Sequence, residues 1–232
     1  MPIDIQAMAK QMLFAILRVR TINGLLRRLR KPVLLLLPEG TVGRIPVLGQ
    51  VKVCAADSVV VLLDSDGTDS LASSIYWNGL QAFEPETVDL YMRLLRHANV
   101  VFDIGAYTGL YTLLAGAERR DRSVHAFEPV PETFAALRRN VEVNTLDNVK
   151  PVWAAVANHD GETPLYIPHT TTLPFSASVK EGFRKAQRTT TVPALTIDTY
   201  VETNGVPRVD LMKIDTEGTE HEVLQGAQTV LE

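Results

Sequence analysis

The chain has 232 residues, of which 46% are hydrophobic and 22% charged, with 14 glycines and 13 prolines. This length fits one ordinary domain with an extension, or two small domains, and the composition excludes collagen-like and disordered chains. Cys54 is the single cysteine and no Asn-x-Ser/Thr acceptor occurs, so an extracellular protein held by disulfides is not expected. No apolar run approaches the roughly 20 residues that span a bilayer. We expect a cytoplasmic globular protein.

The charge is distributed unevenly along the chain. Residues 1–31 form a basic segment with a net charge of +6, so that residues 32–232 carry −10. An acidic body of this kind argues against nucleic acid as the partner, because phosphate binding needs a cationic surface.

Residues 8–30 alternate apolar side chains with five arginines and predict a basic amphipathic helix, broken at Asn23–Gly24. Two interpretations stay open. The helix packs on the body with its arginines toward solvent or the acidic domain, as amphipathic surface helices commonly do, or it lies peripherally on an anionic membrane. A signal peptide is not expected, because most of the charges follow the apolar stretch.

Residues 32–98 predict an N-terminal extension of strands and one helix. The acidic segment 64–69 lacks EF-hand spacing and predicts a turn, not a metal site. Pro85 suits the first turn of a helix. The expected elements are strands Val33–Leu37, Val47–Val53 and Val59–Asp64 and a helix from Pro85 to about His97.

From residue 99 onward, strand and helix patterns alternate, which predicts an α/β core with parallel strands and helices on both faces. Residues 158–193 interrupt this rhythm with an inserted hairpin or flap. The core, residues 99–232, should contain strands Val100–Asp103, Val124–Phe127, Val149–Val156 and Val209–Ile214, and helices Thr108–Glu118, Pro131–Val143 and Thr219–Leu231; the flap should contain strands Thr163–Ile167 and Thr189–Val192.

The first motif runs from Asp103 to Gly109 and joins a buried strand to a helix. Gly105 permits close approach of a ligand to the backbone, and the helix start presents unpaired N–H groups. Tyr107 and Leu110 stand where a dinucleotide fingerprint needs glycine, which disfavours NAD and FAD. A small ligand with an α-amino acid end, whose ammonium pairs with Asp103, fits better. The structural alternative is a strand-to-helix turn with a capping aspartate.

The second motif places Glu128 at the end of the next strand, 23 residues after Gly105. An acidic residue there commonly binds the ribose hydroxyls of a nucleoside cofactor. The alternative is a charge that stabilises the start of the following helix.

The third motif gathers four ionisable residues at the exit of the last strand and the first turn of its helix: Asp215, Glu217, Glu220 and His221. Such sheets bind ligands at the carboxyl ends of their strands. His221 does not begin a zinc-protease motif, because the fifth position is Gln225, and we expect no metal. The alternative is that Glu217 and Glu220 are ordinary charges of a first helical turn.

Together these motifs resemble the FkbM family of S-adenosylmethionine-dependent methyltransferases over about residues 79–228. The resemblance begins near Gly79–Glu86 and includes the Asp103–Gly109 turn, Phe127-Glu128-Pro129, the Leu195–Asp198 approach, and the run Lys213-Ile214-Asp215-x-Glu217-Gly218-x-Glu220. It implies a Rossmann-like methyltransferase sheet and O-methylation of a hydroxyl on a sugar or another small molecule.

Site residues follow from the same resemblance. Asp103, Gly105 and Gly109 would hold the methionine part of the cofactor, with Tyr107 in the same turn, and Glu128 would hold the ribose. The catalytic candidates are Asp215, first choice for the base that removes the hydroxyl proton, then Glu217 and His221.

Two departures from the family pattern matter. Tyr107 replaces a small polar residue and would be costly at a positive φ; it would either stack on the cofactor or weaken its binding. The sequence also stops one helix after strand Val209–Ile214, so the sheet should end there with an exposed edge that the N-terminal segment or another chain, as in a homo-oligomer, would cover. These departures favour an alternative function, a non-catalytic remnant that acts as a binding or membrane-associated module. An NAD(P) oxidoreductase is a third hypothesis, disfavoured by the missing glycines.

Overall fold

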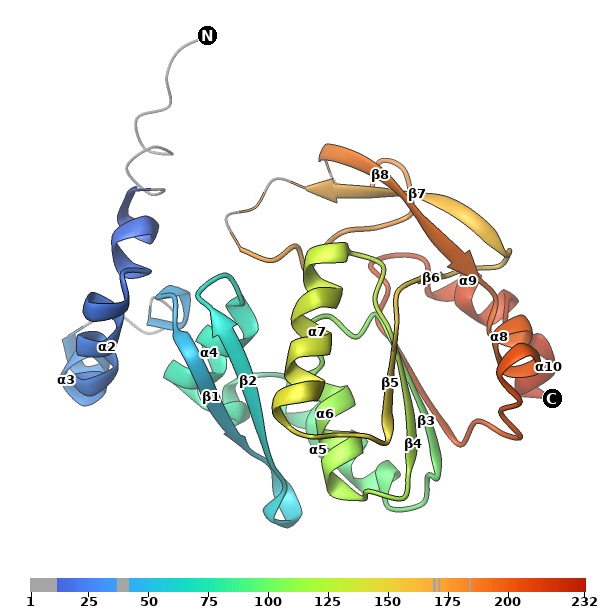
Figure 1. Ribbon diagram of the computed structural model, residues 1–232, viewed down its shortest axis with the longest axis horizontal. Helices are drawn as coiled ribbons and strands as arrows, with labels where there is room; N and C mark the ends of the chain where they lie inside the picture. Colours follow the sequence, from blue (N-terminus) through green and yellow to red (C-terminus); the bar gives the residue numbers. More distant parts are fainter. Residues whose placement is uncertain (1–11, 37–41, 169, 171, 184) are drawn as a thin grey trace, which may run out of the picture.

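A computed structural model describes residues 12–36, 42–168, 170, 172–183 and 185–232. The chain passes from N-terminal helices through a β-hairpin to a parallel sheet between helices (Figure 1). A second, smaller sheet lies across one end of the first. The predicted α/β architecture with helices on both faces of the sheet is confirmed.

The N-terminal segment differs from the prediction in two places. Residues 12–17 are helical, and α2 (Arg20–Arg28) runs through Asn23–Gly24, so the break lies at residues 18–19 instead. Asn23 is buried and donates hydrogen bonds to the carbonyls of Leu17 and Pro46, which explains its place within a helix.

The predicted strand Val33–Leu37 is wrong for the described residues, because they belong to helix α3 (Arg30–Leu36); Leu37 lies outside them. Leu35 and Leu36 are 87% and 81% exposed, so this apolar run is not a buried strand. Leucine favours helices, and a proline is tolerated in the first helical turn.

The extension is built around an antiparallel hairpin, which confirms the two strands predicted there. Strands β1 (Leu48–Cys54) and β2 (Val60–Asp66) pair along their whole length. Helix α4 was not predicted; Asp69 caps its start by accepting a hydrogen bond from the Ala72 N–H. The remaining elements are η1 (Val42–Arg44), η2 (Ala56–Ser58), α4 (Ser70–Asn78), η3 (Leu80–Ala82) and α5 (Pro85–Leu95).

The central sheet has four parallel strands in the order β5-β4-β3-β9. Among the described residues β9 pairs only with β3, which makes it the edge strand that the sequence predicts. The strands are β3 (Val100–Ile104), β4 (Ser123–Phe127), β5 (Val149–Val152) and β9 (Leu211–Ile214). Their helices are α6 (Leu110–Glu118), α7 (Pro131–Val143), α8 (Ile197–Asn204), α9 (Glu220–Gln225) and α10 (Gln228–Leu231).

Two predicted elements are each divided in two. The strand Val149–Val156 stops at Val152, because a tight turn there lets the Ala154 N–H bond to the Val152 carbonyl. The helix Thr219–Leu231 is interrupted at Gly226, where a Cβ atom would lie 2.2 Å from the Ala157 carbonyl oxygen.

The predicted flap is confirmed as a hairpin. Strands β7 (Gly161–Pro168) and β8 (Ala186–Leu195) pair antiparallel, and β6 (Ala155–Val156) joins β8 to complete the smaller sheet. We call residues 158–193 the flap; Figure 1 shows it across the end of the central sheet.

Two hydrophobic clusters fill the two faces of the central sheet. One joins the hairpin and α4–α5 to α6 and α7, so the extension and the parallel sheet share a core. The other packs α8 and α9 against Phe102, Ile104 and Phe127 on the opposite face. The domain boundaries at residues 31 and 98 stay a prediction.

Candidate active site

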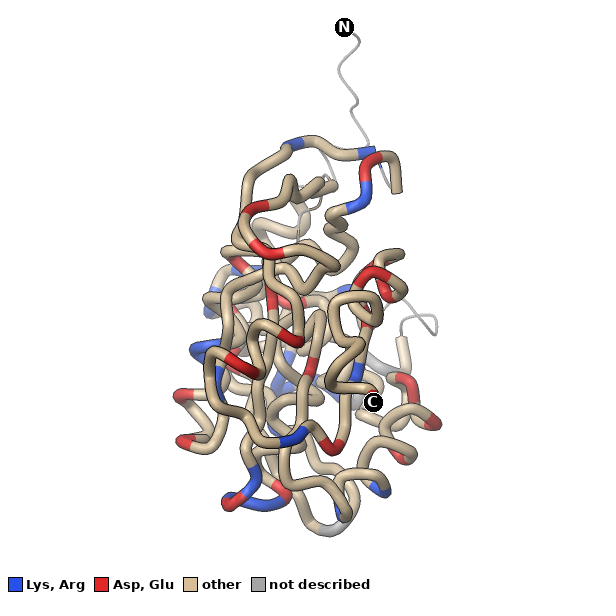
Figure 2. The backbone as a smooth tube through the Cα atoms, turned by 90° about the vertical axis from the view of Figure 1, so that its right-hand side faces the viewer, with Lys and Arg blue, Asp and Glu red and all other residues tan. Residues whose placement is uncertain are grey.

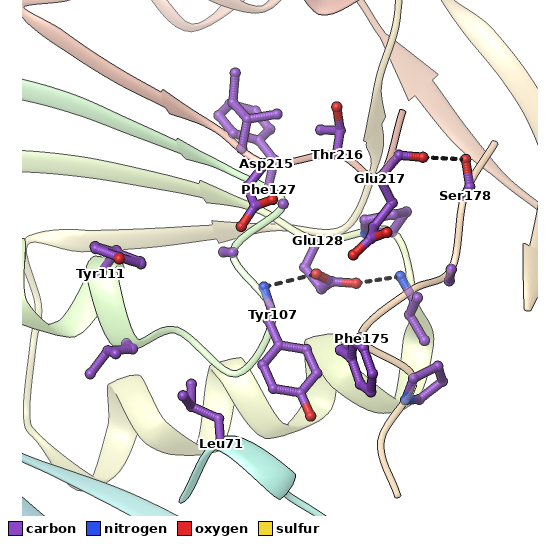
Figure 3. A pocket seen from close by; sticks show the side chains of 18 of the residues that line it. Leu71, Tyr107, Tyr111, Phe127, Glu128, Phe175, Ser178, Asp215, Thr216 and Glu217 are labelled. Carbon is purple, nitrogen blue, oxygen red and sulfur yellow. Dashed lines mark hydrogen bonds between the residues drawn. The ribbon is translucent and has the colours of Figure 1, made fainter. Parts of the chain in front are cut away.

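A cavity of about 650 Å³ lies at the carboxyl ends of β3, β4 and β9. This is the edge at which open α/β sheets bind ligands, and the volume suits a small molecule. The flap closes one side of it with Pro174 to Val179, while η1 and α4 of the extension close another. Figure 3 shows Tyr107, Glu128, Asp215 and Glu217 around this space.

The turn after β3 forms part of the cavity wall. The N–H groups of Gly105 and Ala106 both donate to the Phe127 carbonyl, at 3.0 and 2.9 Å, which ties the turn to β4. Gly105 has a φ of +76°, and a Cβ atom there would lie 2.0 Å from the Asp215 carbonyl oxygen. Only glycine therefore fits between the two strand exits. Gly109 does not line the cavity; it supports the turn, because its Cα faces Leu137 of α7.

Glu128 lies on the cavity wall but is only 5% exposed. Its two carboxylate oxygens accept hydrogen bonds from the N–H groups of Tyr107 and Val130, both at 2.9 Å (Figure 3). Burial raises the pKa of Glu128 to about 8, although the two hydrogen bonds act in the opposite direction. A carboxyl group held this way still has free lone pairs for ligand hydroxyls.

Tyr107 occupies the left-handed region, with a φ of +53°. A side chain in that conformation costs about 1–2 kcal/mol, so the turn carries the strain expected from the sequence. Its backbone N–H is the donor to Glu128, and its hydroxyl lies 3.4 Å from Ser70 Oγ. The ring lines the cavity.

Asp103 lies behind the cavity wall and is fully buried. Thr112 donates a hydrogen bond of 2.6 Å to its Oδ2, and Lys213 Nζ lies 3.6 Å from its Oδ1. Burial lowers the pKa of Lys213, but Asp103 and Asp215 outweigh this effect and raise it overall. Lys213 therefore stays charged. Its side chain lines the cavity, whereas that of Asp103 does not.

Glu84 and Tyr111 are site residues that the sequence analysis did not identify. Both line the cavity beside Lys213. The Tyr111 hydroxyl donates a hydrogen bond of 2.9 Å to Glu84 Oε2, and Lys213 Nζ lies 4.8 Å from the centre of the Tyr111 ring. Glu84 itself has a φ of +41°. Glu84 lies within Gly79–Glu86, where the resemblance to the family begins, and this position could have indicated a role in the site.

The catalytic candidates separate in the structure. Asp215 and Glu217 line the cavity, whereas His221 lies outside its lining, with an exposed side chain 3.9 Å from Glu222. Asp215 is exposed and its Oδ2 accepts a hydrogen bond of 3.3 Å from Lys213. The Glu217 carbonyl accepts a hydrogen bond from Ser178 of the flap, which joins the flap to the loop after β9.

Glu220 shapes that loop without lining the cavity. Its Oε1 accepts hydrogen bonds of 3.1 Å from the N–H groups of Thr216 and Gly218. Within the described part of the chain, no group of three or more His, Cys, Asp or Glu side chains could hold a metal ion.

Comparison with known proteins shows that the chain is similar to methyltransferases. The chain is 31% identical over 160 residues to the 31-O-demethyl-FK506 methyltransferase FkbM of Streptomyces tacrolimicus, covering 58% of this chain and 61% of that protein. It is 26% identical over 151 residues to the hexuronic acid methyltransferase AglP of Haloferax volcanii, covering 64% of this chain and 58% of AglP. The chain thus spans about 60% of the length of these relatives.

A solved structure of Trm5b from Pyrococcus abyssi aligns at 19% identity and a TM-score of 0.30, over 50% of this chain and 36% of that one. The family model of the methyltransferase FkbM domain matches residues 103–232, which include every site residue that the sequence analysis selected. This chain belongs to the FkbM methyltransferase family.

Proposed function

We propose that the cavity binds S-adenosylmethionine and that the protein transfers its methyl group to a hydroxyl group. The observation that carries this proposal is Glu128: a buried carboxyl group on the cavity wall, at the carboxyl end of β4, beside the glycine turn after β3. Ribose hydroxyls would donate to the lone pairs that the backbone N–H groups leave free.

Two further charged groups of the cavity suit an amino acid. They are an ammonium group on Lys213 and a carboxylate on Glu84, which complement the carboxylate and ammonium of a methionine moiety. Asp103 was expected to pair with that ammonium; because it is buried behind the wall, we assign this role to Glu84. Asp103 would act through Lys213, whose charge it stabilises.

When bound, S-adenosylmethionine supplies a methyl group activated by a sulfonium. The protein's task is to orient the acceptor oxygen in line with that methyl group and to remove the hydroxyl proton. Asp215 is our first candidate for the base, because it is exposed toward the cavity at the exit of β9. Glu217, in the same loop, is the second.

The acceptor would be a small molecule or a sugar, in keeping with the names of the two relatives. The cavity walls support this class. Leu71, Phe83 and Phe175 offer apolar surface, and Ser70 and Ser178 offer hydroxyl groups.

Calorimetric titration of the protein with S-adenosylmethionine, S-adenosylhomocysteine and NAD tests the cofactor. We expect saturable binding of the first two and none of NAD. Glu128→Gln should weaken binding by about tenfold or more, because the Gln amide has one acceptor oxygen where Glu128 has two, and a buried group left without its partner costs about 1–3 kcal/mol. Glu132→Gln is the matched control, because Glu132 is an exposed glutamate four residues further along the chain. This variant should bind S-adenosylmethionine as tightly as the wild type.

A folded protein that binds neither sulfur compound would refute the cofactor assignment. The alternative hypothesis, a methyltransferase relative that acts as a binding module, would then replace it.

A further inference from the structure

The N-terminal helices attach to the body through hydrogen bonds of Asn23 and Arg27 as well as through a few half-buried apolar side chains. Asn23 is 2% exposed, donates to the Pro46 carbonyl at 2.6 Å and accepts from the Leu48 N–H at 3.0 Å. One turn further along α2, Arg27 donates to the carbonyls of Leu48 and Gln50 in β1. Helices usually bury most of their apolar side chains, whereas in the described part of this segment only Leu17, Leu26 and Val33 pack, half-buried, against the core.

Most apolar side chains of this segment consequently face away from the body. Nine of the seventeen large apolar side chains that are exposed in the described part of the chain lie between Met12 and Leu36, which are 63% and 81% exposed. Several, including Ile16, Ile22, Leu25 and Leu29, recur at spacings of three to six residues. An apolar surface of this extent marks an interaction site.

The charges on the same segment are all of one sign. Residues 12–36 contain six Lys or Arg residues and no Asp or Glu. Arg20 and Arg28 are exposed beside the apolar side chains. The segment lies at the outer edge of the molecule, beyond β1 (Figure 1), whereas acidic and basic residues are interspersed on the opposite side (Figure 2).

We propose that residues 12–36 dock the protein on an anionic lipid surface. Leucine and isoleucine side chains would enter the boundary between headgroups and acyl chains, while arginines bind the phosphates of the headgroups. No helix of the described residues is long and apolar enough to cross a bilayer. A second copy of the chain fits less well, because a symmetric dimer would bring the same cations together.

Flotation of the full chain with vesicles tests the proposal. We expect binding to vesicles of phosphatidylglycerol and phosphatidylcholine in equal parts, little binding to phosphatidylcholine alone, and weaker binding at high salt. The variant Leu25→Glu/Leu29→Glu should lose binding by at least about tenfold. Leu90→Glu/Leu94→Glu is the matched control, since these α5 side chains are similarly exposed, at 50% and 45%.

A second set of variants tests the contribution of the arginines to vesicle binding. Arg20→Gln/Arg28→Gln should weaken vesicle binding by about fivefold for each arginine removed. Arg93→Gln/Arg138→Gln removes two exposed cations elsewhere and should leave binding nearly unchanged. Circular dichroism should show that every variant keeps the native helix content.

Three results would overturn the proposal. The first is no flotation with the anionic vesicles, which would leave this surface to a protein partner. The second is equal loss of binding in the Leu90/Leu94 control. The third is a dimer in sedimentation without lipid that Leu25→Glu/Leu29→Glu dissociates while flotation is absent, which would assign the surface to a second copy.

Discussion

Lys213 Nζ lies 3.6 Å from Asp103 Oδ1, and the two residues face each other across the neighbouring strands β3 and β9. The Asp103 side chain is fully buried and that of Lys213 is 15% exposed. Within the described residues Asp103 Oδ1 has no hydrogen-bond partner, so the Lys213 charge compensates it. The pair therefore joins the edge strand to the rest of the sheet and presents a cation to the cavity.

Lys213→Met should strongly destabilise the protein, by about 3–5 kcal/mol, because it leaves the Asp103 carboxylate buried without a counter-charge. Urea unfolding measures this change. The double variant Asp103→Asn/Lys213→Met should recover much of the loss. Arg93→Met, which breaks an exposed ion pair with Asp89, is the control and should cost less than about 1 kcal/mol. No recovery in the double variant would contradict the pairing.

Glu128 should make the free energy of unfolding depend on pH. Its pKa is about 8 in the folded protein against 4.5 ordinarily, so between these values the folded state binds a proton that the unfolded state has released. The contribution of Glu128 to the free energy of unfolding is thus greatest at low pH. It decreases by about 1.4 kcal/mol per pH unit between the two pKa values. Glu128→Gln should lack this dependence.

The measurement for Glu128 is the difference in unfolding free energy between wild type and Glu128→Gln at several pH values. Subtraction removes the other titrating groups. His125 is one of them: burial lowers its pKa to about 4, so its contribution is lost as the pH falls from 6.5 toward 4. A difference that does not change with pH would show that Glu128 is ionised in the folded protein.

Gly105→Ala should destabilise the protein and abolish cofactor binding. The new Cβ would lie 2.0 Å from the Asp215 carbonyl oxygen, so the β3 turn and the loop after β9 must separate. Gly205→Ala is the matched control, since Gly205 also has a positive φ, +61°, but a Cβ added there would meet no atom within 4 Å. It should cost only about 1 kcal/mol from backbone strain. Equal losses in thermal unfolding would reject the steric explanation.

Asp215→Asn should lower turnover by about 10²–10⁴-fold while leaving cofactor affinity close to normal, if Asp215 is the base. Single-turnover kinetics with an accepted substrate, beside a calorimetric titration, separate these two effects. Glu217→Gln serves as the comparison, and a larger loss there would transfer the role to Glu217. Full turnover in Asp215→Asn would exclude Asp215 as the base.

Much of the core could be predicted from sequence because its signals are local. The alternation of short apolar runs with helical patterns between residues 99 and 214 depends on neighbours a few positions apart. The same holds for the glycine turn after Asp103 and for Glu128 at a strand end, and these features place most of the predicted site on one edge of the sheet. A residue at the carboxyl end of a parallel strand lies at that edge regardless of the conformation of the loops.

Only the tertiary structure decided which groups share the cavity and which helix surface is left exposed. Glu84 joins Tyr111, 27 residues later, and Asn23 binds a carbonyl 23 residues later. The sequence predicts a strand at Val33–Leu37 where the described residues form a helix, because a short apolar run has no period that distinguishes the two. Periodicity and propensity act over a few residues, whereas burial, charge compensation and hydrogen-bond partners depend on distances between residues far apart in the chain.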